Sequence, residues 1–260
     1  MSSDVLTVST RDEIARVALA RPDVRNAFNA DLIANLARAF EHLARDPGVR
    51  AIVLRGEGKA FCGGADIGWM RASLDLSRDE NVADARKMSE MFRTIDRCPK
   101  PVIAAIHGAA LGGGAGLAAV CDIVVCARDA IFGFTEVKLG IIPAVISPFV
   151  LSKIGVSNAR ALFLTGQRFD AERARAIGLV HEVVAPEELD AAVERTITEI
   201  RSAGPGAVAA AKRLIERVSE TPYDESRDIT AEAIAGQRTT PEGQEGLRAF
   251  LERRPPQWNA

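Results

Sequence analysis

The sequence has few of the residues that mark disulfide-rich, metal-binding or nucleic-acid-binding proteins. Its 260 residues include four cysteines and three histidines. The cysteines form no C-x-x-C pair and the histidines have no metal-ligand spacing, so we expect reduced thiols and no bound metal. Lys and Arg number 33 against 35 Asp and Glu, a formal charge of −2, which argues against a nucleic-acid partner.

Long apolar stretches without charge are also missing. No such stretch reaches the ~18 residues that a membrane-spanning helix requires. Residues 102–120 come nearest, but glycines and a histidine interrupt them, and we interpret them as buried core. The N-terminal residues lack the basic and apolar regions of a secretory signal. We therefore expect a cytoplasmic protein that does not enter a membrane.

What the sequence does contain is an alternation of short apolar runs and amphipathic helices. Alternating residues predict two strands in the first 20 positions, and apolar residues at helical spacing predict a helix over 29–46. Further buried strands are expected at 49–56, 100–108 and 121–127. The order strand, glycine-rich loop, helix occurs twice in the first half, which is typical of an α/β fold with parallel strands.

The remaining segments divide into loops and a helical end. Residues 56–70 are expected to form a glycine-rich loop, and the polar residues 71–87 a mobile stretch before a helix that includes Met88 to Ile95. From about residue 186 the strand pattern is replaced by successive helices. We expect a core over residues 1–200 and a helical region over 201–260 that packs on the body or on a neighbouring subunit.

Two glycine-rich loops follow buried strands. In the first, LGGGAGLAAV (111–120), glycines would let backbone N–H groups approach a ligand. Gly114-x-Gly116-x-x-Ala119 matches a dinucleotide fingerprint, but Asp129 follows sooner than the ~20 residues that the fingerprint requires. The second loop is AFCGGAD (60–66). Either the two are tight turns, or N–H groups from both converge on one carbonyl oxygen as an oxyanion hole.

Glu136 is the strongest candidate for a catalytic side chain. Apolar residues surround it in AIFGFTEVKLGIIPAVISPF. Burial favours the protonated form of a carboxylate, which suits a general acid or base near neutral pH. His107, beside a glycine, is interpreted as a core histidine, and a nucleophilic role for Cys62 is a minor alternative. The chain has no Gly-x-Ser-x-Gly elbow, which argues against a serine hydrolase.

Six segments in this order resemble the crotonase superfamily, also called the enoyl-CoA hydratase/isomerase family, over essentially the whole chain. They are ARPDVRNAFN (20–29), GKAFCGGADIGWM (58–70), KPVIAAIHGAALGGGAGLAAVCDIVVCA (100–127), FGFTEVKLGIIPAVISPF (132–149), LTGQRFDAERARAIGLVHEVV (164–184) and EGLRAFLERR (245–254). The resemblance implies an α/β spiral of ββα units with a C-terminal helical tail. It also implies a homotrimer or homohexamer, an acyl-CoA thioester as the partner, and no cofactor beyond the coenzyme A of the substrate.

The resemblance assigns roles to particular positions. The backbone N–H groups of Gly63 and Gly113 would hold the thioester carbonyl, and Glu136 would be the catalytic carboxylate. Enolate formation puts negative charge on that carbonyl oxygen, which preorganised donors stabilise. The substrate-binding positions implied are Ala65, Asp66 and Ile67 beside the adenine-pantetheine portion of CoA, Arg25 near its phosphates, and Phe250 and Arg253 from the tail.

Gly116 departs from the family pattern, because hydratases of straight-chain enoyl-CoA usually carry a glutamate there. Glu136 alone would suit a Δ3-Δ2-enoyl-CoA isomerase, which moves one proton between two carbons. Alternatively, the substrate supplies a carboxylate, or an acid from the 71–87 stretch replaces the missing one: Asp75, Asp79, Glu80 or Asp84.

Two segments, FTEVKLGIIPAVISPF and PEGQEGLRAFLERRPPQW, resemble the bacterial branch acting on 3-methylglutaconyl-CoA and isohexenylglutaconyl-CoA. In that case Lys138 or Arg71 would pair with the substrate's own carboxylate. We therefore expect a hydratase acting on a branched or glutaconyl-type acyl-CoA. The non-enzymatic alternatives are an acyl-CoA-binding relative without turnover and an RNA-binding protein, the second disfavoured by the near-neutral charge.

Overall fold

The computed structural model describes residues 2–259, which form two compact units. One comprises residues 2–98 and 102–193, and the other comprises residues 99–101 and 194–259. None of the described helices is long and apolar enough to cross a membrane. The predicted boundary after residue 200 lies inside helix α7 (Leu189–Ser202).

Seven strands form the main sheet of the first unit, in the order β1-β2-β3-β4-β5-β7-β10. β1 (Ser2–Ser3), β2 (Leu6–Arg11) and β3 (Ile14–Leu19) pair antiparallel. Parallel pairing then continues through β4 (Ala51–Gly56), β5 (Val102–Ile106), β7 (Ile123–Ala127) and β10 (Glu182–Val184). Every residue of β5 is buried, as expected for a parallel strand covered on both faces. The predicted α/β class with parallel strands is confirmed.

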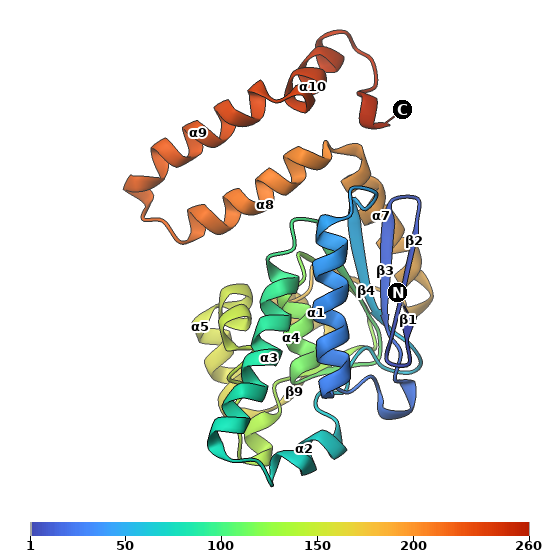
Figure 1. Cartoon of the computed structure of the whole chain (residues 1–260), viewed down its shortest axis with the longest axis vertical. Coiled ribbons are helices and arrows are strands. Elements are labelled where there is room, and N and C mark those ends of the chain that lie inside the picture. The colour runs from blue at the N-terminus through green and yellow to red at the C-terminus, as the bar shows by residue number, and fades with distance from the viewer. Residues whose placement is uncertain (1, 260) are drawn as a thin grey trace. The chain divides into compact units, whose positions relative to one another are not determined.

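Helices of the first unit cover the sheet with their apolar faces. In α1 (Ala30–Arg45) the Asn29 side chain caps the helix by accepting a hydrogen bond from the Leu32 N–H at 2.9 Å. α1 and α3 (Arg78–Asp96) lie side by side (Figure 1). The short α4 (Gly113–Val120), buried throughout, contacts both α3 and α5 (Ser147–Thr165). The remaining helices of this unit are α2 (Ile67–Ser73), α6 (Ala171–Ala176), the start of α7 and the 3-10 turns η1 (Pro22–Val24) and η3 (Pro186–Glu188).

A second, three-stranded sheet places the segment that carries Glu136. Its strands are β6 (Ala109–Leu111), β8 (Ile131–Gly133) and β9 (Arg168–Asp170), in the order β6-β8-β9. The register aligns Leu111 with Gly133 and Gly133 with Arg168. The chain leaves β8 into the 3-10 turn η2 (Glu136–Leu139), so Glu136 follows directly after this sheet.

Two expectations for residues 56–87 were wrong. The helix α2 begins at Ile67, inside the expected loop, and α3 begins at Arg78, inside the stretch expected to be mobile. A capping box explains the second case: the Ser77 side chain accepts from the Glu80 N–H, and the Glu80 carboxylate accepts from the Ser77 N–H. The first turns of α3 are mostly exposed, so no apolar period marks them in the sequence.

The second unit is helical, as predicted. It contains the end of α7, then α8 (Pro205–Ser219), α9 (Ser226–Thr239) and α10 (Pro241–Leu251), with η4 (Tyr223–Glu225) and η5 (Gln257–Asn259). α8 and α9 run side by side (Figure 1). The Glu242 carboxylate accepts from the Gly206 and Ala207 N–H groups at 2.8 and 2.7 Å, which ties α10 to the start of α8.

Candidate active site

The two glycine-rich loops are hydrogen-bonded to each other. The Cys62 N–H donates to the Ala109 oxygen at 2.9 Å, and the Leu111 N–H donates to the Cys62 oxygen at 3.0 Å. A Cβ on Gly114 would lie only 2.4 Å from the Cys62 oxygen, so glycine is required for this approach. The loops that follow β4 and β5 therefore form one continuous backbone surface.

The structure corrects the expected role of the Gly63 amide. The Gly63 N–H donates to the Arg25 oxygen at 2.7 Å, so it is engaged within the chain and does not face a ligand. The neighbouring donor is Ala65. The Gly64 oxygen accepts from the Phe28 N–H at 2.7 Å and the Asp66 N–H donates to the Phe28 oxygen at 2.9 Å, while the Ala65 N–H has no acceptor among the described residues.

Gly113 supplies a second N–H group without a partner in the described part of the chain. It is the first residue of α4, and the first N–H groups of a helix have no acceptor inside that helix. A Cβ on Gly113 would lie 2.9 Å from the Phe28 ring and from the Met88 methyl group. Phe28 thus contacts both donors, Ala65 through its backbone and Gly113 through its ring.

Glu136 lies against the same loop. A Cβ on Gly112 would be 3.1 Å from its Oε1, and Gly112 has a φ of +51°, so only glycine combines this backbone with this approach. The Oε2 atom is buried and has no hydrogen-bond partner among the described residues. Burial raises the pKa of this carboxyl above its ordinary value, and a hydrogen bond from its own backbone opposes the shift in part. The side chain is therefore suited to exchange protons near neutral pH.

Gly116, the position of the missing carboxylate, is closed to any side chain. It lies one helical turn after Gly112 on α4, and a Cβ there would be 2.3 Å from Ile146 Cγ2 and 3.1 Å from Phe92 Cζ. Both of these apolar residues are buried. The space that a longer residue would need at position 116 is thus already filled by apolar side chains.

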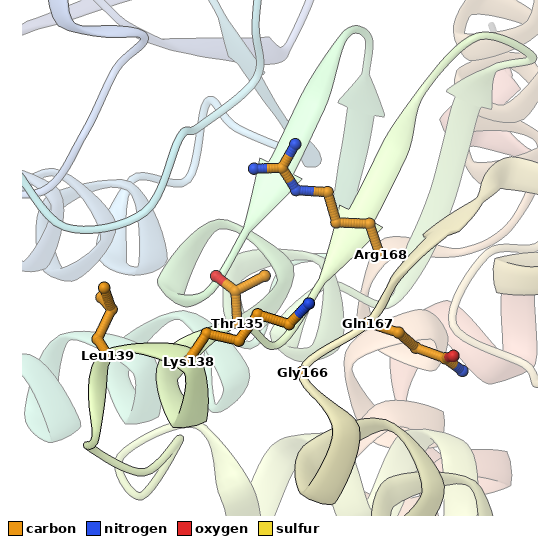
Figure 2. A pocket seen from close by; sticks show the side chains of 6 residues that line it. All are labelled: Thr135, Lys138, Leu139, Gly166, Gln167 and Arg168. Carbon is orange, nitrogen blue, oxygen red and sulfur yellow. The ribbon is translucent and has the colours of Figure 1, made fainter.

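A cavity of about 490 Å³ borders the η2 turn. Figure 2 shows its lining residues: Thr135, Lys138, Leu139, Gly166, Gln167 and Arg168. The Lys138 side chain passes over Gly166, where a Cβ would lie 3.1 Å from Lys138 Cγ. Neither Lys138 nor Arg168 forms an ion pair or a side-chain hydrogen bond within the described residues, so both cations are available to an anion.

The other predicted binding residues lie in different surroundings. Arg25 is exposed and lies against Gly63, since a Cβ on Gly63 would be 3.2 Å from that of Arg25. Ile67 is 73% exposed. The Asp66 carboxylate is occupied within the chain, where it caps α2 and pairs with Arg21. Phe250, 82% exposed, and Arg253 belong to the second unit, and their part in CoA binding stays a prediction.

Several alternative residues are excluded from chemistry by their contacts. Cys62 is fully buried, and burial raises the pKa of its thiol to about 12, so it is not an activated nucleophile. His107 Nε2 lies 2.9 Å from the Gly58 oxygen, consistent with a structural histidine. Of the acids in the 71–87 stretch, Glu80 is engaged in the α3 cap. Asp75, Asp84 and Asp79, an exposed residue 3.7 Å from Arg78, stay open as predictions.

The free N–H of Ala65, expected only beside the CoA moiety, and the place of Arg168 beside Lys138 were missed from the sequence. Which amide of AFCGGAD points outward depends on its pairing with Phe28, and no local signal indicates that pairing. The two cations of the cavity come from η2 and β9, which only the small sheet brings together.

Comparisons with known proteins agree with this geometry. Residues 9–260 match the family described as enoyl-CoA hydratase/isomerase. The chain is 35% identical to a putative enoyl-CoA hydratase of Thermus thermophilus, with 95% of this chain and 98% of the relative covered. It is also 35% identical to the crotonyl-CoA hydratase of Syntrophomonas wolfei, with 98% and 97% covered.

Among solved structures, a putative enoyl-CoA hydratase/isomerase (crotonase) from Legionella pneumophila superimposes with a TM-score of 0.93 at 39% identity, covering 98% of this chain and 99% of that one. Pseudomonas aeruginosa AtuE superimposes with a TM-score of 0.95 at 35% identity, covering 98% and 100%. These likenesses confirm the crotonase-like fold. The chain therefore belongs to the enoyl-CoA hydratase/isomerase family.

Proposed function

We propose that this protein is an enoyl-CoA hydratase, which adds water across the C2=C3 bond of a 2-enoyl-CoA or removes it. One observation carries the proposal: two backbone N–H groups without acceptors among the described residues, on Ala65 and Gly113, lie in two hydrogen-bonded loops, and Glu136, whose Oε2 has no partner there, lies against the second of these loops. The hydratase names of relatives that match over nearly their full length support it.

In the proposed reaction the two N–H groups donate to the thioester carbonyl oxygen. Ionised Glu136 takes a proton from a water molecule as the water oxygen bonds to C3, and the C2=C3 electron pair moves to form an enolate. The charge that develops on the carbonyl oxygen is stabilised by the two fixed donors. Protonated Glu136 then gives the proton to C2, and the carbonyl is restored. One carboxylate thus performs both proton transfers.

We further propose that the acyl group is of the branched or glutaconyl type and carries its own carboxylate. The cavity beside η2 supports this, because Lys138 and Arg168 are cations without an acidic partner in the described residues, and Lys138 lies in the same turn as Glu136. Hydrogen bonds between ionised groups are shorter and stronger than neutral ones, so two cations would discriminate such a substrate from an uncharged acyl chain. Coenzyme A enters as part of the substrate.

A second candidate function follows from the closed space at Gly116. Because Ile146 and Phe92 fill that position, no carboxylate enters from residue 116, whereas Glu136 lies against Gly112. Moving one proton between C2 and C4 of an enoyl-CoA needs a single base, which is the requirement of a Δ3-Δ2-enoyl-CoA isomerase.

The test is turnover of three thioesters by the purified protein: 3-methylglutaconyl-CoA, crotonyl-CoA and a 3-enoyl-CoA. We expect hydration of the first two, with the higher kcat/KM for the first. Turnover of the 3-enoyl-CoA alone would replace the hydratase with the isomerase, and thioester binding without any turnover would indicate a non-enzymatic binder.

The substrate class is tested with Lys138→Met and Arg168→Met. Each is expected to lower kcat/KM for 3-methylglutaconyl-CoA by about 10- to 100-fold, since a hydrogen bond to a charged group contributes ~1.5–3 kcal/mol. The kcat/KM for crotonyl-CoA should change little. Arg175→Met, at an exposed position of α6, is the matched control. An equal loss on both substrates would contradict recognition of a distal carboxylate.

A further inference from the structure

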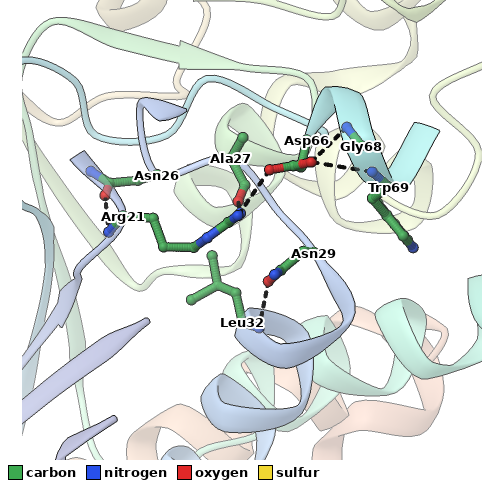
Figure 3. Close-up of polar contacts among 8 residues, drawn as sticks. All are labelled: Arg21, Asn26, Ala27, Asn29, Leu32, Asp66, Gly68 and Trp69. Atoms are coloured by element: carbon green, nitrogen blue, oxygen red, sulfur yellow. Dashed lines mark hydrogen bonds and ion pairs between the residues drawn. The ribbon is translucent and has the colours of Figure 1, made fainter. Parts of the chain in front are cut away.

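A polar network joins the segment 21–28 to the loop that contains Ala65 (Figure 3). Arg21 Nη2 donates to Asp66 Oδ2 at 2.9 Å, and Arg21 Nη1 donates to the Ala27 oxygen. The other Asp66 oxygen, Oδ1, accepts from the N–H groups of Gly68 at 2.7 Å and Trp69 at 3.1 Å. A single carboxylate thus connects Arg21 to the first turn of α2.

The network is mostly shielded from solvent. The side chains of Arg21 and Asp66 are 17% and 15% exposed. Partial burial alone would raise the pKa of Asp66, but hydrogen bonds from Arg21, Trp69 and Gly68 outweigh it and hold the pKa below its ordinary value. Asp66 is therefore ionised at neutral pH, and shielding from solvent strengthens its attraction to Arg21.

Asn26 anchors the other end of the segment. It is fully buried, with 0% exposure. Its Oδ1 accepts from the Arg21 N–H, and its Nδ2 donates to the Glu57 and Ala60 oxygens, each at 2.8 Å. Through Asn26 the backbone of Arg21 is thereby tied to the chain that leads from β4 into the glycine loop.

This network affects the direction in which the Ala65 N–H points. Phe28 bonds to the Gly64 oxygen and to the Asp66 N–H, the groups on either side of Ala65. In extended backbone successive N–H groups point to opposite sides, so this pairing turns the Ala65 N–H away from Phe28. Arg21 binds a neighbour of each paired residue. It donates to the oxygen of Ala27, next to Phe28, and to the carboxylate of Asp66, next to Ala65.

We propose that Arg21 is a positioning residue for the oxyanion site: its guanidinium, bound to Asp66 and to the Ala27 oxygen, fixes the Ala65 N–H toward the thioester carbonyl. The inference rests on the proposed function, in which that carbonyl is the ligand. The planar guanidinium serves two acceptors in fixed directions, which a lysine ammonium on a flexible stem does not reproduce. A donor displaced by about 1 Å loses ~10²-fold in rate, so the effect of Arg21 is expected in kcat.

The experiment uses Arg21→Met, Arg21→Lys and, as matched control, Arg55→Met, which removes another Arg–Asp pair of the same unit, at 3.3 Å from Asp190. For crotonyl-CoA, Arg21→Met should lower kcat by about 10- to 100-fold with little change in KM. Arg21→Lys should recover part of the loss, and Arg55→Met should behave as wild type. Circular dichroism melts identify variants that are not folded at the assay temperature.

A readout without turnover separates this inference from the proposed function. The infrared carbonyl stretch of bound [1-13C]butyryl-CoA reports polarisation of the thioester by the two N–H groups. We expect a shift to lower frequency in wild type and Arg55→Met, most of it lost in Arg21→Met and partly regained in Arg21→Lys. A full shift retained in folded Arg21→Met would overturn the role of Arg21. No shift in wild type would instead overturn the proposed thioester site.

Discussion

At the scale of single residues, Glu136 is a position where the proposed chemistry lowers the stability of the folded protein. Glu136 has a buried oxygen without a hydrogen-bond partner among the described residues, and its side chain lies against the backbone of Gly112. An uncompensated buried carboxylate destabilises the folded state when it is ionised. The same burial raises its pKa and so improves it as a proton donor and acceptor near neutral pH. Function and stability therefore oppose each other at this position.

The variant Glu136→Gln tests that opposition. We expect kcat to fall by about 10²- to 10⁴-fold, because the amide cannot accept the proton of water. Since the folded-state pKa of Glu136 is raised, its ionisation destabilises the folded protein above that pKa, and this effect disappears below the ordinary pKa of an unfolded glutamate.

The variant should thus melt at a higher temperature than wild type at about pH 8, and the two should converge near pH 4. Glu187→Gln, at an exposed position in η3, is the control and should alter neither quantity. In wild type the acid limb of the kcat/KM profile should lie above the usual glutamate range. A higher melting temperature for wild type at both pH values would contradict this account.

At the scale of elements, the start of α4 has glycine at two positions where another part of the chain comes close. Gly112 faces Glu136, and Gly116, one turn later, faces Ile146 and Phe92. Glycine in a helix interior is unfavourable by ~1 kcal/mol relative to alanine, so its presence at 116 requires a reason. The reason is close packing, because Ile146 occupies the volume that any β-carbon would need.

This packing predicts that a glycine-to-alanine substitution has opposite effects on stability in α4 and in α9. Gly116→Ala should destabilise the protein by ~1–3 kcal/mol through overpacking, despite the better helix propensity of alanine. Gly236→Ala in α9, where a Cβ would have nothing within 4 Å, should instead stabilise by ~0.5–1 kcal/mol.

Urea unfolding of both variants measures the two differences. A double variant of Gly116→Ala with Ile146→Ala should lose less stability than the sum of its single changes, since Ile146→Ala removes the contact. Strict additivity would show that Ile146 is not the obstacle.

At the scale of the whole molecule, the second unit exposes several large apolar side chains. None of the residues of α8 and α9 is buried. Ile215 is 71% exposed, and Phe250 and Leu251 are 82% and 78% exposed. Clusters of exposed apolar residues on helices are typical of association surfaces. We propose that this unit takes part in homo-oligomer formation, in line with the trimers and hexamers that the family resemblance implies.

Sedimentation equilibrium tests the assembly. We expect a mass three or six times that of the 27.8 kDa chain. Ile215→Asp and Leu251→Asp should shift it toward the monomer, because a charge within an apolar interface is costly to desolvate. Leu74→Asp, at an exposed site of the first unit, should leave the mass unchanged. A monomeric wild type would contradict the proposal.

The fold class, the family and the candidate carboxylate Glu136 could all be predicted from the sequence. Buried strands, glycine loops and Glu136 within an apolar segment are local patterns, and local patterns are visible without coordinates. The helical start of α3 was missed because its first turns bury little, although the Ser77–Glu80 capping signal was present.

Which backbone N–H groups are left free for a ligand could be seen only in the folded chain. Gly63 and Ala65 are two residues apart and equally able to donate an N–H, but pairing with Arg25 and Phe28 engages one and leaves the other without an acceptor among the described residues. Likewise, the sequence shows that residue 116 carries no carboxylate, but only the folded chain shows that Ile146 fills the space beside it. Hydrogen-bond direction and packing depend on residues distant in the chain, and these residues come together only once the chain has folded.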